Sequence, residues 1–283
     1  MAKKKSVLDF YEMKKKGEKI TFLTAYDFPT AQFAEASGLD MLLVGDSLGM
    51  CVYGYSGTIP VVMDQMIHHA EAVSRGAPNT FIIGDMPFMS YQSSVEKAVE
   101  NAGRFLKEAN CDAIKLEGGV RIGPQIRAIV DAGIVVMGHI GLTPQSSGQL
   151  GGHKAQGRTA ETARLVVADA LAVKDAGAQM ILLEAIPPEV GKYITENLDI
   201  PVLSIGAGPH CDGQLLIVSD AIGQFQAFTP KFVKKYCNVA EMVTNAMKHY
   251  ADEVRSGEFP RAEHCYNMIA GEEEKFLTSI KDK

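Results

Sequence analysis

MLLVGDS (residues 41–47) is an apolar run that ends in polar residues, and four further segments repeat this pattern: FIIGDMP (81–87), AIKLEGG (113–119), VVMGHIG (135–141) and MILLEAIP (180–187). Such apolar runs are typical of strands that are buried on both faces. The polar residues at their carboxyl ends are Asp46, Asp85, Glu117, His139 and Glu184. In a parallel β-barrel, the carboxyl ends of the strands meet at one mouth, where enzymes of this fold keep their active sites. The pattern therefore predicts that these five side chains converge.

Strand and helix patterns alternate along the rest of the chain, which is typical of a parallel sheet. We expect strands at 20–27, 41–47, 81–87, 113–119, 134–141, 180–187, 201–208 and 216–223. A helix near 231–248 is expected to close the barrel, and 250–283 to form charged terminal helices. About eight such units favour a closed (β/α)8 TIM barrel over an open sheet. No GxGxxG motif follows the first strand, which argues against a dinucleotide-binding fold.

The domain organisation follows from the absence of any low-complexity linker. We predict a single (β/α)8 domain over 1–283, with a short N-terminal helix at 6–17 and a C-terminal helical extension. Two segments without periodicity, 48–63 and 142–158, interrupt the alternation. Loops of this length inside a compact domain are usually lids or binding loops.

Composition narrows the class of protein. The 283 residues carry a net charge of -6 without a long basic run, which argues against nucleic-acid binding. The five cysteines are scattered without a CxxC pair, a pattern that fits a reducing cytoplasm. No run approaches the roughly 18 apolar residues that a membrane span requires. The sequence therefore predicts a cytoplasmic protein that binds neither nucleic acid nor membranes.

Three carboxylates end neighbouring strands of the predicted barrel: Asp46, Asp85 and Glu117. Adjacent carboxylates repel unless a cation lies between them. Carboxylate oxygens completed by water suit Mg2+. The alternative is that each residue is a helix cap or a surface acid. Three carboxylates on adjacent strands favour the magnesium site.

Lys115 lies two residues before Glu117, so both side chains share one face of their strand. A buried lysine requires a partner. Lys115 either pairs with Glu117 for structural reasons or binds a carboxylate or oxyanion of a substrate. A Schiff base is a further, less favoured use of such a lysine.

The remaining candidates are Glu184, His139 and Ser47. The sequence neighbours of Glu184 are apolar, and an apolar setting raises a carboxyl pKa and suits a general base. Helix capping or ion pairing is its alternative role. His139 is either a hydrogen-bonded core residue or a site residue, and Ser47 either holds a ligand carboxylate or serves a turn.

These residue types suggest a general reaction scheme. A 2-oxo acid would chelate Mg2+ through its carboxylate and ketone oxygens. Glu184 would remove a proton from the carbon next to the ketone, and the metal with Lys115 would stabilise the enolate. The enolate would then attack an electrophile, which the residues alone do not identify.

The chain resembles the ketopantoate (3-methyl-2-oxobutanoate) hydroxymethyltransferase family along nearly its whole length. The matching motifs occur in order: TAYD (24–27), VGDSLGM (44–50), GYSGTIPV (54–61), GDMPFMSY (84–91), IKLEGG (114–119), GHIGLTPQ (138–145), GGHKAQGR (151–158), LLEAIP (182–187), IGAGPHCDGQ (205–214) and PKFVKKY (230–236). The resemblance implies a barrel of the phosphoenolpyruvate/pyruvate-binding type. It also implies a one-carbon transferase of pantothenate biosynthesis, on the coenzyme A pathway.

The resemblance further implies the substrates and the roles of the site residues. The enzyme would transfer a hydroxymethyl group from 5,10-methylenetetrahydrofolate to 3-methyl-2-oxobutanoate, giving 2-dehydropantoate and tetrahydrofolate. Glu184 would be the proton acceptor. Mg2+ would be bound by Asp46, Asp85 and Glu117, and the oxo acid by Asp46, Ser47, Asp85, Lys115 and His139. The family also suggests a homo-oligomer, expected to be a decamer.

Two alternatives remain at this point. One is another Mg2+-dependent oxo-acid barrel, of the isocitrate lyase or phosphoenolpyruvate mutase type, although the KKCGH-like loop of those enzymes is missing. The other is a barrel that binds a metabolite without turnover. The chain departs from the family pattern at His153 and Ala155, where an aromatic residue and a valine are expected.

Overall fold

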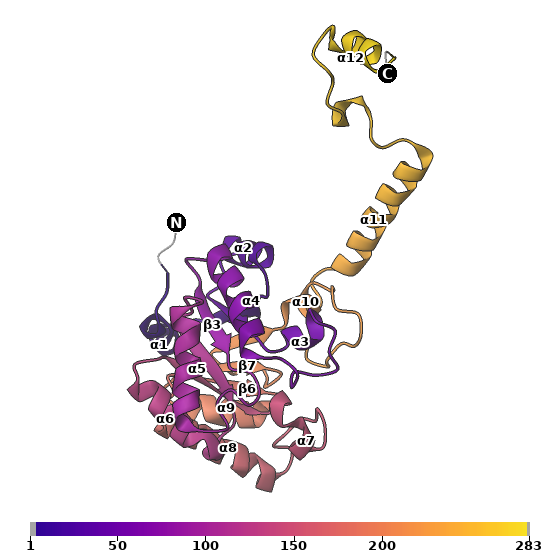
Figure 1. Ribbon diagram of the computed structural model, residues 1–283. Helices are drawn as coiled ribbons and strands as arrows, with labels where there is room; N and C mark the ends of the chain where they lie inside the picture. Colours follow the sequence, from indigo (N-terminus) through magenta and orange to yellow (C-terminus); the bar gives the residue numbers. More distant parts are fainter. Residues whose placement is uncertain (1–3, 282–283) are drawn as a thin grey trace. The chain divides into compact units, whose positions relative to one another are not determined.

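A closed parallel barrel forms the centre of the computed structural model, which describes residues 4–281. Its eight strands follow one another in chain order, and β8 pairs with β1. Figure 1 shows the strands at the centre of this unit. The predicted (β/α)8 architecture is confirmed. The strands are β1 (Ile20–Thr24), β2 (Met41–Val44), β3 (Phe81–Asp85), β4 (Ala113–Glu117), β5 (Val136–Gly141), β6 (Met180–Glu184), β7 (Val202–Ile205) and β8 (Gly213–Leu216).

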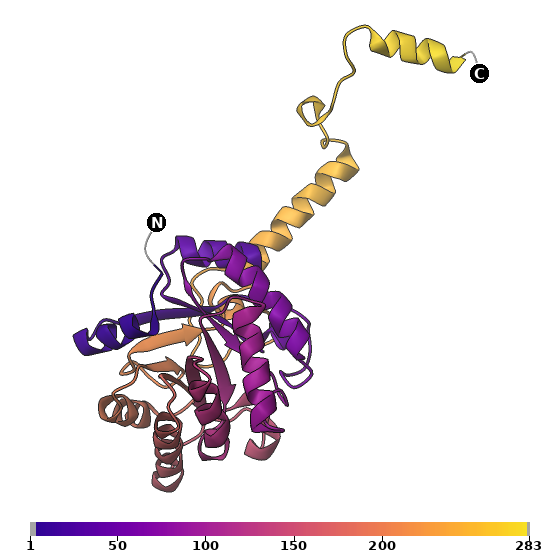
Figure 2. The same ribbon diagram turned by 60° about the vertical axis from the view of Figure 1, so that its left-hand side comes forward.

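Helices cover the outside of the strands, as the labels of Figure 1 and the turned view in Figure 2 show. Those of the barrel unit are α1 (Val7–Lys16), α2 (Phe28–Ala36), α3 (Leu48–Cys51), α4 (Met63–Gly76), α5 (Val95–Lys107), η1 (Val120–Ile122), α6 (Gly123–Asp131), η2 (Pro144–Ser146), α7 (Ser147–Leu150), α8 (Ala160–Asp175), α9 (Pro188–Asn197) and α10 (Val218–Ala221). The two segments predicted as long loops thus contain the short helices α3, η2 and α7.

Several helices begin where the sequence supplies a cap. Asp27 precedes α2 and accepts a hydrogen bond from the Thr30 N–H, while Pro29 occupies the first turn. Ser94 and Thr159 cap α5 and α8 in the same way. A capping side chain satisfies a backbone donor that the helix itself leaves unpaired. These caps fix where each helix starts after its strand.

Strand side chains divide between two apolar clusters. Ala113 belongs to the cluster inside the barrel, whereas Ile114 and Leu116 belong to the cluster beneath the outer helices. Because side chains alternate along a strand, Lys115 and Glu117 share the inner face with Ala113. The inner face of β4 is therefore apolar at its start and charged at its end.

The register of the strands places polar residues side by side at the mouth. Asp85 pairs with Lys115 between β3 and β4, and Glu117 pairs with His139 between β4 and β5. Glu184 at the end of β6 lies beside the last residue of β5. Neighbouring strands lie about 4.8 Å apart, so side chains from adjacent strands reach one another.

The opposite end of the barrel is filled by aromatic side chains. Phe10 of α1 is fully buried and joins the inner apolar cluster. Its ring meets that of Phe81, the first residue of β3, edge to face with centroids 5.1 Å apart. The N-terminal helix therefore closes the floor of the barrel.

The position predicted for strand eight was wrong. β8 spans Gly213–Leu216, and the residues that follow form α10 instead of continuing the strand. Gly213 permits this earlier pairing, since a Cβ there would lie 2.5 Å from the Ile20 carbonyl oxygen. The apolar run 216–222 was read as a strand because buried helix and buried strand have the same composition over short runs.

The helix predicted near 231–248 is also displaced. The chain divides into two compact units, Met1–Tyr236 and Cys237–Lys283. The helix of this region is α11 (Val239–Ser256), which belongs to the second unit with η3 (Ala262–His264) and α12 (Glu272–Lys281). The single-domain organisation expected from the sequence stays a prediction. In the part of the chain from 4 to 281, no helix is long and apolar enough to cross a membrane.

Candidate active site

The structure brings the five predicted strand-end side chains into one cavity of about 820 Å³ at the barrel mouth. Asp46, Asp85, Glu117 and His139 are at most 4% exposed. The Glu184 side chain is 15% exposed. Lys115 and Ser47 line the same cavity. The mouth therefore gathers charged groups that are almost completely shielded from water.

Lys115 is the cation at the centre of this cluster. Its Nζ lies 2.7 Å from Asp85 Oδ1, 3.6 Å from Glu117 Oε1 and 3.2 Å from His139 Nδ1. Burial alone would lower the pKa of this ammonium, but the surrounding carboxylates of Asp85, Glu117 and Asp46 raise it above its ordinary value. Lys115 is therefore charged at neutral pH, and its closest partner is Asp85 and not Glu117.

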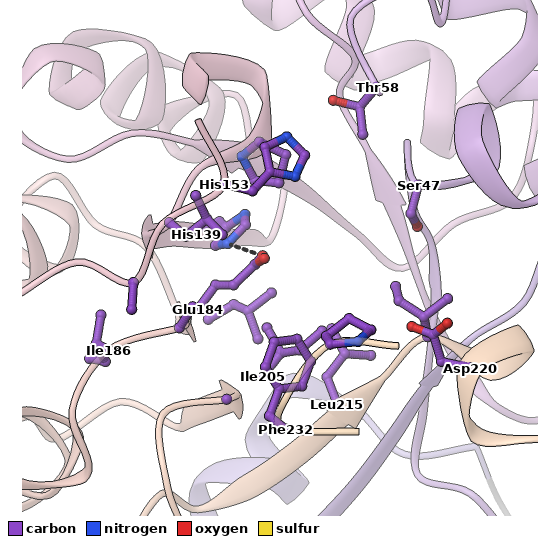
Figure 3. A pocket seen from close by; sticks show the side chains of 18 of the residues that line it. Ser47, Thr58, His139, His153, Glu184, Ile186, Ile205, Leu215, Asp220 and Phe232 are labelled. Atoms are coloured by element: carbon purple, nitrogen blue, oxygen red, sulfur yellow. Dashed lines mark ion pairs between the residues drawn. The ribbon is translucent and has the colours of Figure 1, made fainter. Parts of the chain in front are cut away.

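His139 connects two carboxylates across neighbouring strands. Its Nδ1 lies 3.4 Å from Glu117 Oε1, and its Nε2 lies 3.1 Å from Glu184 Oε2 (Figure 3). Burial and Lys115 lower the pKa of His139, but the contacts with Glu117 and Glu184 outweigh them and raise it to about 9. In the imidazolium form both ring nitrogens carry a proton. Each nitrogen lies near a carboxylate oxygen, although Nε2 makes no well-directed hydrogen bond.

Glu184 is not in the apolar setting that its sequence neighbours predicted. Its carboxylate faces His139, because β5 and β6 are adjacent and both side chains project to the mouth. Burial raises the pKa of Glu117, but the positive charges of Lys115 and His139 lower it by more. The pKa of Glu117 is therefore below its ordinary value. Lys115, Glu117, His139 and Glu184 thus form one continuous chain of alternating charge.

Asp46 and Asp85 bring two further carboxylates together. The Asp46 N–H donates to Asp85 Oδ2 at 3.0 Å. Burial and repulsion from Asp85 and Glu117 raise the pKa of Asp46 well above its usual range. Burial likewise raises the pKa of Asp85, although Lys115 opposes the shift. Asp85 Oδ1 faces Lys115 but accepts no well-directed hydrogen bond.

This donor set fits Mg2+, which often takes only one or two carboxylates and completes its shell with water and substrate oxygens. A cation would also relieve the repulsion between Asp46 and Asp85. Among residues 4–281, no group of three or more His, Cys, Asp or Glu side chains is arranged to hold a metal. Glu117 Oε2 accepts a hydrogen bond from the Gln145 N–H at 3.0 Å. The direct ligands that fit are therefore Asp46 and Asp85, with Glu117 behind them.

Two buried residues that the sequence analysis did not single out complete the cluster. The Gln145 amide donates to Asp46 Oδ2 at 2.9 Å, and its carbonyl accepts from the Tyr91 hydroxyl at 2.8 Å. The same hydroxyl accepts from the Glu117 N–H at 3.0 Å. Tyr91 lies in the loop after β3, inside GDMPFMSY, and Gln145 lies in η2 after β5, inside GHIGLTPQ, so neither is a polar strand end. The signal that would have revealed these two residues is the burial of a polar side chain outside the strands.

The backbone that carries Glu184 adopts an uncommon conformation. Ala185 has φ 47°, in the left-handed region that residues with a Cβ seldom occupy. Its N–H donates to Ile205 O at 2.9 Å, and its carbonyl accepts from the Gln156 N–H at 3.0 Å. Gly141, with φ 90°, leaves room for the Glu184 carbonyl, which would lie 2.4 Å from a Cβ there. These contacts fix the direction in which Glu184 leaves β6.

Ser47 lies at the start of α3 without using its hydroxyl as a cap. Its Oγ is instead 2.7 Å from the Tyr26 hydroxyl. Since Ser47 lines the cavity, this pair supplies a polar group next to Asp46. The alternative role of Ser47, which was to serve a turn, does not explain why its hydroxyl contacts Tyr26.

Comparison with known proteins bears on the chemistry of this cavity. Residues 4–262 match the family model described as ketopantoate hydroxymethyltransferase. The 3-methyl-2-oxobutanoate hydroxymethyltransferase of Alkaliphilus metalliredigens is 64% identical over 274 residues, which is 97% of each chain. The enzyme of that name from Moorella thermoacetica is 53% identical over 90% of this chain and 94% of its own.

Solved structures share the fold at much lower sequence identity. A phosphonopyruvate hydrolase in complex with oxalate and Mg2+ superposes with a TM-score of 0.61 at 12% identity, covering 99% of each chain. A 2,3-dimethylmalate lyase, a member of the PEP mutase/isocitrate lyase superfamily, gives a TM-score of 0.58 at 18% identity over 100% of both chains. These similarities confirm the predicted type of barrel and concern the fold alone.

Proposed function

The chain belongs to the ketopantoate hydroxymethyltransferase family, and we propose that it transfers the one-carbon unit of 5,10-methylenetetrahydrofolate to 3-methyl-2-oxobutanoate. The products are 2-dehydropantoate and tetrahydrofolate. Family membership makes the chain a hydroxymethyltransferase of pantothenate biosynthesis. To this family membership we add, as a proposal, the folate donor, the magnesium ion and the roles of the individual residues.

The observation that carries the proposal is the buried chain of charges from Lys115 through Glu117 and His139 to Glu184. It provides a fixed positive group and a carboxylate base on the same cavity. Formation of an enolate needs both, since a proton leaves carbon while negative charge develops on the ketone oxygen. The alternating charges hold these groups in place before the substrate arrives.

In this arrangement Glu184 takes the proton from C3 of 3-methyl-2-oxobutanoate. His139 holds the Glu184 carboxylate through the contact at 3.1 Å, which fixes its direction. The Lys115 ammonium faces the negative charge that develops on the substrate oxygen, and Ser47 offers a hydroxyl to the substrate carboxylate. Glu117 orients both Lys115 and His139.

Asp46 and Asp85 would hold Mg2+, with Glu117 acting through water. When bound, the ion would supply Lewis-acid stabilisation to the carboxylate and ketone oxygens of the oxo acid. Gln145 fixes one oxygen of Asp46 and leaves the rest of that carboxylate available. Lys115 lies 2.7 Å from Asp85, so its ammonium balances the charge of this proposed ligand while it faces the substrate.

The overall transfer balances with one water molecule. The C3–H bond of the oxo acid breaks and a C3–carbon bond to the methylene unit forms. Both bonds from the methylene carbon to the folate nitrogens break, and each nitrogen gains one hydrogen of the water. The water oxygen remains on the transferred carbon, and the proton taken by Glu184 returns to the new hydroxyl.

Exchange of the substrate proton without folate tests the base. With Mg2+, the protein should exchange the C3 proton of 3-methyl-2-oxobutanoate in D2O. Glu184→Gln should bind the oxo acid but exchange about 10²–10⁴-fold more slowly, the usual contribution of a general base. Glu189→Gln, an exposed carboxylate on α9, is the matched control. Undiminished exchange in Glu184→Gln would remove Glu184 as the base.

The metal ligands require a separate test. An Asp46→Ala/Asp85→Ala variant should lose the Mg2+ dependence of both exchange and transfer. Isothermal titration of Mg2+ in the presence of the oxo acid gives a readout that does not depend on turnover. A double variant that retained Mg2+ binding and Mg2+-dependent activity would refute the ligand assignment.

We also propose that the chain acts as a homo-oligomer in the cytoplasm. The second unit supports self-association, because α11 buries none of its residues and exposes Met242, Met247 and Tyr250 at 60–67%. Exposed apolar side chains in such number are typical of surfaces that a partner covers. The decamer rests on the family resemblance, and native mass spectrometry would count the subunits.

A further inference from the structure

The cavity has a second polar wall that the proposed reaction leaves unused. In Figure 3, His139 and Glu184 lie on one side, and Asp220 lies on the other. We call the side formed by Lys115, Glu117, His139 and Glu184 the Glu184 wall. The side formed by Thr58, Asp220 and the aromatic residues of 225–232 is the Asp220 wall. The small oxo acid fills only part of a cavity of about 820 Å³.

Asp220 is a buried carboxylate without a partner. The residue is 6% exposed, and its backbone N–H is used in a bond to Ile217 O. No hydrogen bond or ion pair from the part of the chain at 4–281 reaches its carboxylate. Burial raises its pKa, and the more distant charge of Lys235 offsets only part of this effect. Buried carboxylates are normally paired, so an unpaired one that lines a cavity points to a ligand.

Thr58 provides an independent observation on the same wall. The residue is 5% exposed, and its hydroxyl oxygen is buried without a hydrogen-bond partner among the described residues. It comes from the long segment after β2, whereas Asp220 comes from α10 after β8. Both residues line the cavity. Two residues from distant segments, each with a polar group that the fold leaves without a hydrogen bond, thus line one cavity.

Aromatic side chains lie next to Asp220 in the sequence and line the same cavity. Phe225 and Phe228 pack edge to face with ring centroids 5.6 Å apart. Phe232 lies against Gly206, where a Cβ would stand 2.5 Å from its ring. Partly exposed aromatic rings that share a cavity with a carboxylate suit a heterocycle that carries N–H donors at one edge.

We propose that the Asp220 wall is the subsite for the fused-ring head of the folate donor, with the Asp220 carboxylate accepting two N–H bonds from its 2-amino-4-oxopyrimidine edge. A ring N–H and an adjacent amino group form a fork of parallel donors, the geometry that a carboxylate binds in a bidentate manner. The Thr58 hydroxyl is available to the neighbouring ring oxygen or nitrogen. This inference rests on the proposed use of a folate donor.

The arrangement also separates the two substrates by chemistry. The oxo acid carries negative charge and has Lys115 on its side of the cavity. The folate head offers neutral N–H donors and finds a carboxylate on its side. An anionic substrate is repelled from Asp220, and an N–H fork is repelled from Lys115. Each substrate is therefore directed to one wall.

Direct binding of tetrahydrofolate tests the subsite. Affinity is measured by titration calorimetry for the full chain and for Asp220→Asn, with tetrahydrofolate and with an analogue that has methyl in place of the 2-amino group. Charge-assisted hydrogen bonds of this kind predict a loss of about 10- to 100-fold for Asp220→Asn with tetrahydrofolate. The full chain should show a similar loss with the analogue, and Asp220→Asn should not distinguish the two ligands. Glu100→Gln, an exposed carboxylate on α5, is the matched control.

The outcomes separate this inference from the proposed reaction. If the full chain transfers the one-carbon unit but Asp220→Asn binds tetrahydrofolate with unchanged affinity, the subsite is wrong and the reaction stands. Equal affinity of the full chain for tetrahydrofolate and the analogue overturns the subsite without any variant. If the full chain neither transfers from the folate donor nor binds tetrahydrofolate, the proposed function is overturned and the subsite with it.

Discussion

The two walls of the cavity differ in how their polar groups are satisfied. On the Glu184 wall, each charged group has a partner within 3.6 Å. On the Asp220 wall, the buried Thr58 hydroxyl has no hydrogen-bond partner among the described residues, and the only charge that acts on Asp220 is that of the more distant Lys235. Groups that partner one another are held in place before a substrate binds, as catalysis requires. Groups without partners gain them when a ligand arrives, as recognition requires.

Removal of the cation from the Glu184 wall should have the largest effect. Lys115→Met keeps the length of the side chain but leaves Asp85 and Glu117 buried without their counter-charge. We expect the free energy of unfolding to fall by about 3–5 kcal/mol, as when a buried ion pair loses one partner. The turnover number should fall by about 10²–10³-fold, as for the loss of one oxyanion-stabilising donor. Urea unfolding and steady-state kinetics measure the two effects.

Lys192→Met is the control for this prediction. Lys192 forms an exposed pair with Glu196 at 3.8 Å on α9. Exposed pairs contribute little to stability, so unfolding and kinetics should both stay close to those of the parent chain. If Lys115→Met and Lys192→Met had the same stability and the same turnover number, Lys115 would not be the residue that holds the Glu184 wall together.

Loss of a hydroxyl behind the Glu184 wall should have an intermediate effect. Tyr91→Phe removes the acceptor of the buried Glu117 N–H and the donor to Gln145. An unsatisfied buried donor costs about 1–3 kcal/mol of unfolding free energy. Tyr193→Phe on α9, where the residue is 54% exposed, should leave stability unchanged. Identical midpoints for both variants in urea would contradict the role given to Tyr91.

Loss of a hydroxyl on the Asp220 wall should have the smallest effect on stability. Thr58→Val removes an oxygen that has no partner, so the free energy of unfolding should stay the same or rise slightly. Affinity for tetrahydrofolate should nevertheless fall by up to about tenfold, the contribution of one neutral hydrogen bond.

Thr80→Val is the matched comparison, because the equally buried Thr80 hydroxyl donates to Glu35 Oε2 at 3.2 Å. This variant should lose about 1 kcal/mol of stability and keep its affinity for tetrahydrofolate. If instead Thr58→Val lost stability and Thr80→Val lost affinity for tetrahydrofolate, the two walls would not differ in the way on which the subsite depends.

The sequence predicted the Glu184 wall better than the Asp220 wall, for physical reasons. The apolar strands fix which residues lie at the mouth, and alternation along β4 fixes that Lys115 and Glu117 share a face. The contact between His139 and Glu184 was missed because adjacency of strands does not reveal how side chains meet. The sequence left His139 open between a core residue and a site residue, and the structure places it between two carboxylates.

Residues outside the strands were beyond the reach of the same pattern. Gln145 and Tyr91 depend on how loops fold over the mouth, and loop sequences have no periodicity to interpret. Asp220 was overlooked because its segment was taken for the eighth strand. In α10 it instead turns its carboxylate into the cavity, which is visible in Figure 3.

The aromatic floor of the barrel bears on the order of events during turnover. Phe10 and Phe81 fill the end opposite the mouth, so both substrates share the upper opening of the cavity. Lys115 and Glu117 lie deep beneath that opening at 2% exposure, and a folate head on the Asp220 wall would cover them. The small acid should then enter before the large donor, and the large product should depart before the small one. In the language of steady-state kinetics this is an ordered sequence, in which tetrahydrofolate bound to the free chain would act as a dead-end inhibitor that covers the route of the oxo acid.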